Sequence, residues 1–202
     1  MKEKGRLFII SGPSGCGKDT LLKTYFDRHE DVEFSVSTIT RPKRDKSDDE
    51  KYSFVTVEAF KELIEQNRLL EYAEYCGNFY GTPKEPIEKW ISEGKDVLVE
   101  VETVGAEKIK AEMPEAISIF ILPPSVELLK KRLSGRATET PEQLEKRLDK
   151  AIEEMKKSVF YDYIVVNDSL EQAAEAFERI ILSDRQKTER NINFINEVLK
   201  NA

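Results

Sequence analysis

A glycine-rich segment suited to holding phosphate lies near the N-terminus, at residues 12–20, and reads GPSGCGKDT. It fits the pattern G-x-x-x-x-G-K, in which backbone N–H groups surround a phosphate chain and the lysine reaches the β- and γ-phosphates. The pattern places Ser or Thr after the lysine, whereas this chain has Asp19. A carboxylate is also a competent ligand for Mg²⁺, so Asp19 is a candidate metal contact; if no metal takes up its charge, Asp19 would instead weaken the binding of a triphosphate. The alternative interpretation is a plain glycine turn with an exposed lysine.

A second candidate site for an anion is the basic segment RPKRDK, at residues 41–46. Arg41 and Arg44 are separated by a proline and a lysine, and the proline favours an extended backbone. Two such guanidinium groups suit a phosphate dianion, although the same segment is also compatible with a solvated basic patch. Arg132 and Arg147 lie in charged helical segments, where arginine is often simply solvated.

The order of predicted elements puts the glycine loop in the right context. Residues 6–11 predict a strand and residues 18–29 a helix, so that backbone amides and a helix N-terminus converge on one point. Further strands are expected at 34–39, 52–56 and 69–75, with a helix at 57–67 and turn chemistry at 76–82. Helices and strands then alternate: helices at 83–94, 104–112, 126–133, 141–157 and 173–190, and strands at 96–101, 117–122 and 163–167.

The apolar runs VLVEV and ISIFIL are typical of parallel strands covered on both faces. These patterns predict an α/β fold with a parallel sheet flanked by helices. Residues 35–82 form a mostly β insertion into it, and we see no internal repeat or separate C-terminal domain.

Composition limits the classes of partner. The chain has 202 residues, 39% of them hydrophobic and 35% charged, with a net charge of −7, so no global field attracts nucleic acid or anionic lipid. No apolar run approaches the length of about 18 residues that a membrane helix needs. The N-terminal apolar run is short and leads directly into the glycine loop, unlike a signal peptide, and we expect a cytoplasmic protein. Cys16 and Cys76 lack metal-ligand spacing and are expected to be reduced thiols, and the single histidine, His29, is expected to be solvated.

Taken in order, several segments of the chain resemble guanylate kinase. They are SGPSGCGKDT, FSVSTITRPKR, YSFV, EYAEYCGNFYGT, VLVEVETVGA, IFILPPS, RLSGRATE and YIVVND. The resemblance covers nearly the whole chain and implies transfer of a phosphoryl group from ATP, with Mg²⁺, to GMP. It also implies a P-loop NTPase-type core at residues 1–34, 83–124 and 158–202, a β-rich GMP-binding insertion at 35–82, and a helical lid at 125–157.

The resemblance assigns roles to residues of this sequence. ATP binding is expected at Gly12, Ser14, Gly15, Cys16, Gly17, Lys18, Asp19, Thr20, Arg132 and Arg136, and the catalytic group comprises Lys18, Arg41, Arg136 and Arg147. GMP binding is expected at Ser37, Arg41, Arg44, Tyr52, Glu71, Tyr80, Thr82 and Glu102.

Within the GMP set, Glu71 and Thr82 are expected to recognise guanine. A carboxylate accepts from the N1–H and N2–H₂ groups and a hydroxyl faces O6, whereas adenine would leave the carboxylate unpaired. Ser37 and Glu102 complete the pocket. Glu102 is one methylene longer than the aspartate expected there, which bears on selectivity.

Two alternatives to a GMP kinase stay open at the level of sequence. One is a kinase of the same fold for another purine monophosphate, such as dGMP. The other is a non-catalytic guanylate-kinase-like binding module, since a fold does not fix a function. The sequence leaves open whether the protein is a monomer or a homodimer.

Overall fold

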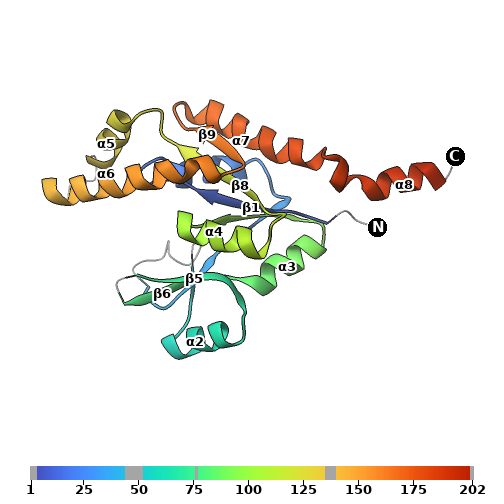
Figure 1. The fold of residues 1–202 in the computed structure, drawn as a ribbon, viewed down its shortest axis with the longest axis horizontal. Coiled ribbons are helices and arrows are strands. Elements are labelled where there is room, and N and C mark those ends of the chain that lie inside the picture. Colours follow the sequence, from blue (N-terminus) through green and yellow to red (C-terminus); the bar gives the residue numbers. More distant parts are fainter. Residues whose placement is uncertain (1–3, 44–51, 76, 135–139, 201–202) are drawn as a thin grey trace. The chain divides into compact units, whose positions relative to one another are not determined.

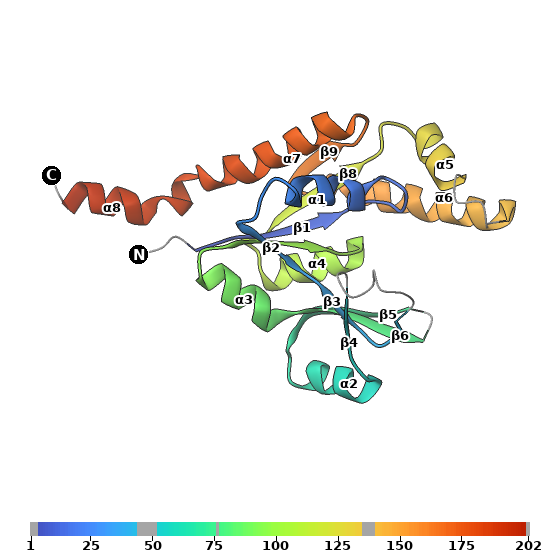
Figure 2. The same cartoon turned by 180° about the vertical axis from the view of Figure 1, so that it is seen from behind.

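The computed structural model describes residues 4–43, 52–75, 77–134 and 140–200 (Figures 1 and 2). The chain divides into two compact units. Unit 1 consists of Met1–Lys4, Ile10–Glu30 and Ser118–Ala202, and unit 2 of Gly5–Ile9 and Asp31–Ile117. This division differs from the core, insertion and lid that the family resemblance suggests, and those three parts remain a prediction.

The larger sheet has the strand order β2-β7-β1-β8-β9, which confirms the α/β fold with a mainly parallel central sheet. Its strands are β1 (Leu7–Ser11), β2 (Val32–Ser35), β7 (Asp96–Glu100), β8 (Ile117–Leu122) and β9 (Tyr163–Val166). β2 pairs parallel with β7, and β8 pairs parallel with β9. Every residue of β1 is buried, as its continuous apolar run predicts.

Unit 1 contains the helices α1 (Lys18–Phe26), α5 (Val126–Ser134), α6 (Pro141–Lys156), α7 (Leu170–Arg185) and α8 (Ile192–Lys200). Two 3₁₀ turns, η2 (Lys157–Phe160) and η3 (Thr188–Arg190), follow α6 and α7. Buried Leu129 and Leu133 of α5 pack against Ala151 of α6, and the two helices lie side by side in Figure 1. This apolar contact holds the charged helix α6 against α5.

The prediction for His29 was wrong. Its ring stacks on Tyr25 with centroids 4.3 Å apart, and its Nε2 lies 3.4 Å from Glu178 Oε1. Tyr25 also packs edge-on against Phe177 of α7 at 5.0 Å. The end of α1 is therefore covered by α7, which makes His29 a packing residue rather than a solvated one.

Unit 2 is built on a smaller sheet with the strand order β4-β3-β6-β5. Its strands are β3 (Ser37–Ile39), β4 (Tyr52–Phe54), β5 (Leu69–Tyr75) and β6 (Asn78–Pro83), and the helices of the unit are α2 (Val57–Glu65), α3 (Lys84–Ser92) and α4 (Thr103–Glu112). Phe60 of α2 stacks on Phe79 of β6 at 5.4 Å, and Figures 1 and 2 draw α2 and α4 on opposite sides of this sheet.

The segment predicted to have turn chemistry at 76–82 is mostly a strand. Only the start of this segment has turn geometry, at Gly77, where φ is +73°. From Asn78 onward, β6 pairs antiparallel with β5. Gly81 looked like a turn residue but serves a close approach, because a Cβ there would lie 2.9 Å from Phe60 Cζ.

The ends of other helices and strands differ from the predicted ends by a few residues. The strand predicted at 34–39 is divided between β2 and β3, and the helix predicted at 173–190 begins at Leu170 and ends at Arg185. Among residues 4–43, 52–75, 77–134 and 140–200, no helix combines the length and apolar character that a membrane crossing requires.

Candidate functional site

The glycine loop joins β1 to α1 in unit 1, as the sequence predicts. Lys18 is the first residue of α1, and its Nζ donates to the carbonyl of Gly12 at 2.7 Å and lies 3.4 Å from the carbonyl of Pro13. The ammonium group is therefore folded back over the loop. Hydrogen bonds to neutral carbonyls are weaker than those to phosphate, so an entering phosphate chain can displace them.

Gly17 shows why the loop needs glycine before the lysine. It caps the N-terminus of α1 in the left-handed region, with φ +92°. A Cβ at this position would lie 2.5 Å from Asn167 Nδ2, so Asn167 would have to shift from its hydrogen bond to the Cys16 carbonyl.

Two side chains brace the loop at the carbonyl of Cys16. Asn167 Nδ2 donates to it at 2.8 Å and Arg132 Nη1 at 3.2 Å, and Arg132 Nη2 donates to the carbonyl of Asn167 at 3.0 Å. Sequence reasoning placed Arg132 near ATP but missed Asn167, although a polar residue at the end of an apolar strand is a signal that can be searched for. Asn167 is 5% exposed, which makes it part of the scaffold of the loop.

The structure describes Arg147 of the predicted lid but not Arg136. Arg147 of α6 donates from Nη2 to Ser14 Oγ at 2.8 Å, so this arginine reaches the loop, and its catalytic role stays a prediction. Arg136 lies outside the described residues. Asp19 and Thr20 are exposed in the first turn of α1. An acidic residue is favoured there by the helix dipole.

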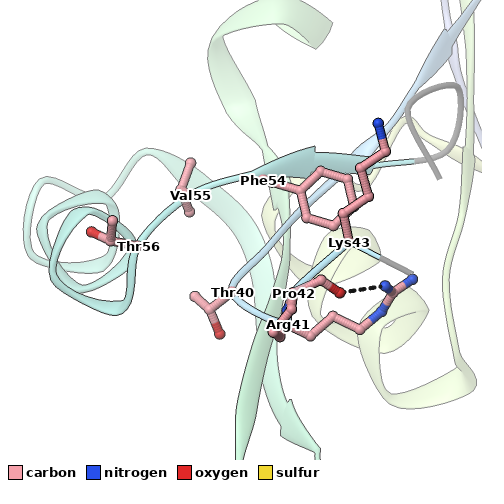
Figure 3. Close-up of a pocket in the computed structure, with 7 residues that line it drawn as sticks. All are labelled: Thr40, Arg41, Pro42, Lys43, Phe54, Val55 and Thr56. Carbon is pink, nitrogen blue, oxygen red and sulfur yellow. Dashed lines mark hydrogen bonds between the residues drawn. The ribbon is translucent and has the colours of Figure 1, made fainter. Parts of the chain in front are cut away.

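Arg41 lies in unit 2 beside a pocket of about 550 Å³ lined by Thr40, Arg41, Pro42, Lys43, Phe54, Val55 and Thr56 (Figure 3). Its guanidinium carbon lies 5.0 Å from the centre of the Tyr52 ring and 5.8 Å from that of Phe54, and Nη1 donates to the carbonyl of Pro42 at 3.0 Å. Arg41 is only 8% exposed, so the guanidinium is held by packing and is not a solvated basic side chain. Arg44 lies outside the described residues.

Four of the predicted GMP-binding residues form a row across the smaller sheet. Tyr52 of β4 pairs with Ser37 of β3, and Thr82 of β6 pairs with Glu71 of β5. Thr38 of β3 pairs with Gly81 of β6, and these two strands are antiparallel. One residue further along the register, Ser37 therefore lies opposite Thr82. Side chains in one cross-strand row point to the same face of the sheet. Helix α2 packs on the opposite face, where Phe79 and Gly81 lie against its Phe60.

Tyr80 lies two residues before Thr82 on β6 and shares its face of the sheet. The structure therefore brings together Ser37, Tyr52, Glu71, Tyr80 and Thr82 on one surface. Glu102 is exposed at the N-cap of α4, the helix that packs on β5.

The Glu71 carboxyl group has an unusual environment. Thr82 Oγ1 donates to Glu71 Oε1 at 2.7 Å. Burial raises the pKa of Glu71 above its ordinary value; the Thr82 hydrogen bond and the charge of Lys108 oppose this, and the charge of Glu102 adds to it. When one oxygen of a half-buried carboxylate accepts a hydrogen bond from a hydroxyl, the other oxygen can still accept hydrogen bonds from N–H donors. A perturbed acid in a row of polar residues is a candidate binding group.

Among the groups that the structure describes, no three His, Cys, Asp or Glu side chains form a cluster suited to a metal ion. Asp19, in the first turn of α1, carries a carboxylate of the kind that Mg²⁺ accepts as a ligand.

Comparisons with known proteins agree on one family. The family model described as guanylate kinase matches residues 4–184. A guanylate kinase of Clostridioides difficile is 44% identical over 199 residues, covering 98% of this chain and 97% of that protein. One from Oceanobacillus iheyensis is 41% identical over 203 residues, covering 100% and 98%.

A solved structure is also similar. The crystal structure of guanylate kinase from Anaplasma phagocytophilum has a TM-score of 0.74 and 32% identity, covering 94% of this chain and 91% of that one. The family match, the relatives at more than 40% identity over nearly the full length and this structural similarity together establish that the chain belongs to the guanylate kinase family.

Proposed function

We propose that this protein transfers the γ-phosphoryl group of ATP to GMP, producing ADP and GDP. The observation that carries the proposal is the hydrogen-bonded pair of Glu71 and Thr82 in the cross-strand row of unit 2. Its carboxylate matches the N1–H and N2–H₂ donors of guanine, and its hydroxyl, which donates to Glu71 in this structure, can instead donate its single hydrogen to O6. Adenine has an acceptor at N1 and would leave a half-buried carboxylate unpaired, a penalty on the order of 1–3 kcal/mol.

The acceptor phosphate is assigned to Arg41, Arg44, Tyr52 and Tyr80. Support comes from Arg41, whose guanidinium is held over the Tyr52 ring and so loses little conformational freedom on binding an anion. Tyr52 and Tyr80 add phenolic O–H donors on the same face of the sheet.

The donor is assigned to the glycine loop. Its backbone amides and Lys18 hold the β- and γ-phosphates, while Arg147, Arg136 and Arg132 neutralise charge on the transferring group. In support, Arg147 already contacts Ser14 in the loop, and Arg132 braces the carbonyl of Cys16. We infer that Lys18 exchanges its contact with the Gly12 carbonyl for a phosphate oxygen when ATP binds.

The residues present fit Mg²⁺ bound together with ATP. Asp19 supplies one hard carboxylate oxygen in the first turn of α1, and one or two carboxylates with substrate phosphates are sufficient for this ion. When bound, Mg²⁺ neutralises charge between the phosphate groups. Because the Asp19 carboxylate is negatively charged, the chain must hold it where it does not repel the triphosphate.

The chemical step needs positioning and charge neutralisation more than a base. The attacking oxygen of GMP is already anionic, so no residue has to remove its proton. The arginines and Lys18 hold donor and acceptor oxygens while the phosphoryl group moves between them.

The test is production of ADP from ATP with GMP, dGMP or AMP as acceptor, while Mg²⁺ is titrated. We expect turnover with GMP, its loss by at least about 100-fold in Lys18→Ala, and an altered Mg²⁺ optimum in Asp19→Ser. A preference for dGMP would assign the alternative substrate. The proposal is wrong if the native chain binds GMP but produces no ADP, which would identify a binding module.

A further inference from the structure

We propose that helix α4 sets the guanine selectivity of this protein through Gly105 and Lys108, which fix the position and the ionised state of the Glu71 carboxyl group. This inference rests on the proposed function, since it concerns the same pocket. Gly105 and Lys108 are three residues apart and therefore lie on the same side of α4.

Gly105 leaves room for the second carboxyl oxygen. A Cβ at this buried position would lie 3.1 Å from Glu71 Oε2 and 3.2 Å from Glu71 Cδ. Glycine is a poor residue for a helix interior, so the close approach of Glu71 accounts for its presence in α4. With Oε1 bound to Thr82 and Oε2 against α4, the carboxyl plane is held from both sides.

Lys108 places a positive charge beside the same group. Its Nζ donates to the carbonyl of Tyr72, the residue after Glu71, at 2.7 Å and lies 5.3 Å from the centre of the Tyr72 ring. The ammonium is thus anchored to β5 and does not move freely in solvent.

The charges around Glu71 act in opposite directions. From α4, Lys108 lowers its pKa and Glu102 raises it, while β6 contributes the neutral Thr82 hydroxyl, which also lowers it. Burial favours the protonated acid, and the charge of Lys108, together with the Thr82 hydrogen bond, favours the ionised form.

The ionisation state decides which base the pocket accepts. An ionised carboxylate only accepts hydrogen bonds, which suits guanine N1–H and N2–H₂. A protonated carboxyl group carries an O–H donor, which suits the N1 acceptor of adenine. Loss of Lys108 therefore weakens GMP and reduces discrimination against AMP, most strongly at acidic pH.

The experiment measures KM for GMP and for AMP between about pH 5 and pH 8 in the full-length enzyme, because this range spans the usual titration of a carboxyl group with a raised pKa. In Lys108→Met, the rise of KM for GMP at low pH should begin at a higher pH than in the native enzyme. KM for ATP should stay unchanged, and Lys108→Arg should restore the native profile. Lys61→Met, an exposed lysine of α2 in the same unit, is the matched control.

Gly105→Ala tests the position of the carboxyl group independently of charge. We expect KM for GMP to rise about tenfold at every pH, without the shift in pH profile, because a misplaced hydrogen-bond acceptor costs roughly this factor. Direct titration of GMP binding by calorimetry should show the same loss.

The inference is overturned if Lys108→Met and the native enzyme have superimposable pH profiles for KM of GMP and equal discrimination against AMP. Failure of the proposed function has a different signature, because the native enzyme itself would then show no GMP-dependent production of ADP.

Discussion

At the scale of single residues, the Glu71 carboxyl group shows how a binding site costs stability. Burial raises its pKa above the value of 4.5 that the group has when unperturbed, so the folded protein holds the proton more tightly than the unfolded chain. The ionised form that suits guanine is the form that burial disfavours. Thr82 and Lys108 offset only part of this cost, since the net shift remains upward.

We expect Glu71→Gln to raise KM for GMP by about 10- to 100-fold, the effect of losing a charge-assisted hydrogen bond. The amide also presents an N–H₂ donor, so discrimination against AMP should fall. KM for ATP should stay constant because the glycine loop belongs to unit 1. Steady-state kinetics with each substrate varied in turn checks this, and an equal loss for ATP and GMP would indicate a structural role for Glu71.

The same substitution should change the pH dependence of stability in the absence of GMP. With a raised folded pKa, the native stability contributed by Glu71 is complete below about pH 4.5, falls as pH rises through the folded pKa, and stays low above it. Glu71→Gln removes this titration, so its stability relative to the native protein should increase from pH 4.5 to pH 7. Urea unfolding at several pH values measures the difference, and a difference that decreases over this range would contradict the upward pKa shift.

At the scale of elements, the glycine loop works because a strand, a helix and two distant side chains fix one backbone path. Gly12 to Gly17 lie between β1 and α1, while Arg132 and Asn167 come from α5 and the end of β9. Both side chains donate to the Cys16 carbonyl and so fix the direction of that peptide group.

Gly17→Ala adds only one methyl group, but we expect it to disrupt the conformation of the glycine loop. The residue has φ +92°, which costs a non-glycine residue roughly 1–2 kcal/mol, and the new Cβ would lie 2.5 Å from Asn167 Nδ2. We expect ATP affinity to fall at least tenfold while GMP still raises the melting temperature. Calorimetric titration with each nucleotide measures this.

Gly17→Ala combined with Asn167→Ala serves as a control, because it removes the steric clash and keeps the backbone strain. Partial recovery of ATP affinity would separate the two contributions. An unchanged ATP affinity in Gly17→Ala alone would show that the loop does not need the left-handed conformation.

Contacts between elements that are distant in sequence limit how much of the structure the sequence can predict. The spacing of Gly12, Gly17 and Lys18 carries a local pattern, so the loop and its flanking strand and helix were predicted correctly. The brace by Asn167 was missed because it depends on a contact between residues 151 positions apart. The row from Tyr52 to Glu71 depends on strand register, and the role of Gly105 depends on a distance across α4 and β5, neither of which a sequence pattern contains.

At the scale of the whole molecule, a buried ion-pair group in unit 1 lies where the segment after α7 contacts the N-terminal segment. Asp184, near the end of α7, is fully buried, with Lys187 Nζ 2.8 Å from Oδ1 and Arg190 Nη1 2.9 Å from Oδ2. Arg190 Nη2 also donates to the carbonyl of Lys4 at 3.2 Å. The family model ends at Asp184, so the cations that neutralise it come from the segment that follows.

This arrangement ties residues 187–190 to the buried end of α7. A buried carboxylate that loses a partner keeps its desolvation cost, and breaking such a pair costs about 3–5 kcal/mol. We expect Arg190→Met to destabilise the protein by about 3 kcal/mol, at the lower end because Lys187 remains. Arg179→Met, which breaks an exposed pair with Glu175, should cost less than about 1 kcal/mol.

A double-mutant cycle with Asp184→Asn tests the reason for this loss, by urea unfolding at constant pH. If the uncompensated charge is the cause, Asp184→Asn combined with Arg190→Met should be more stable than Arg190→Met alone, because the amide has no charge to neutralise. Additive losses would instead mean that Arg190 acts through its packing and its bond to Lys4. In that case the C-terminal segment would stabilise the fold through its contact with the N-terminal segment and not through the charge of Asp184.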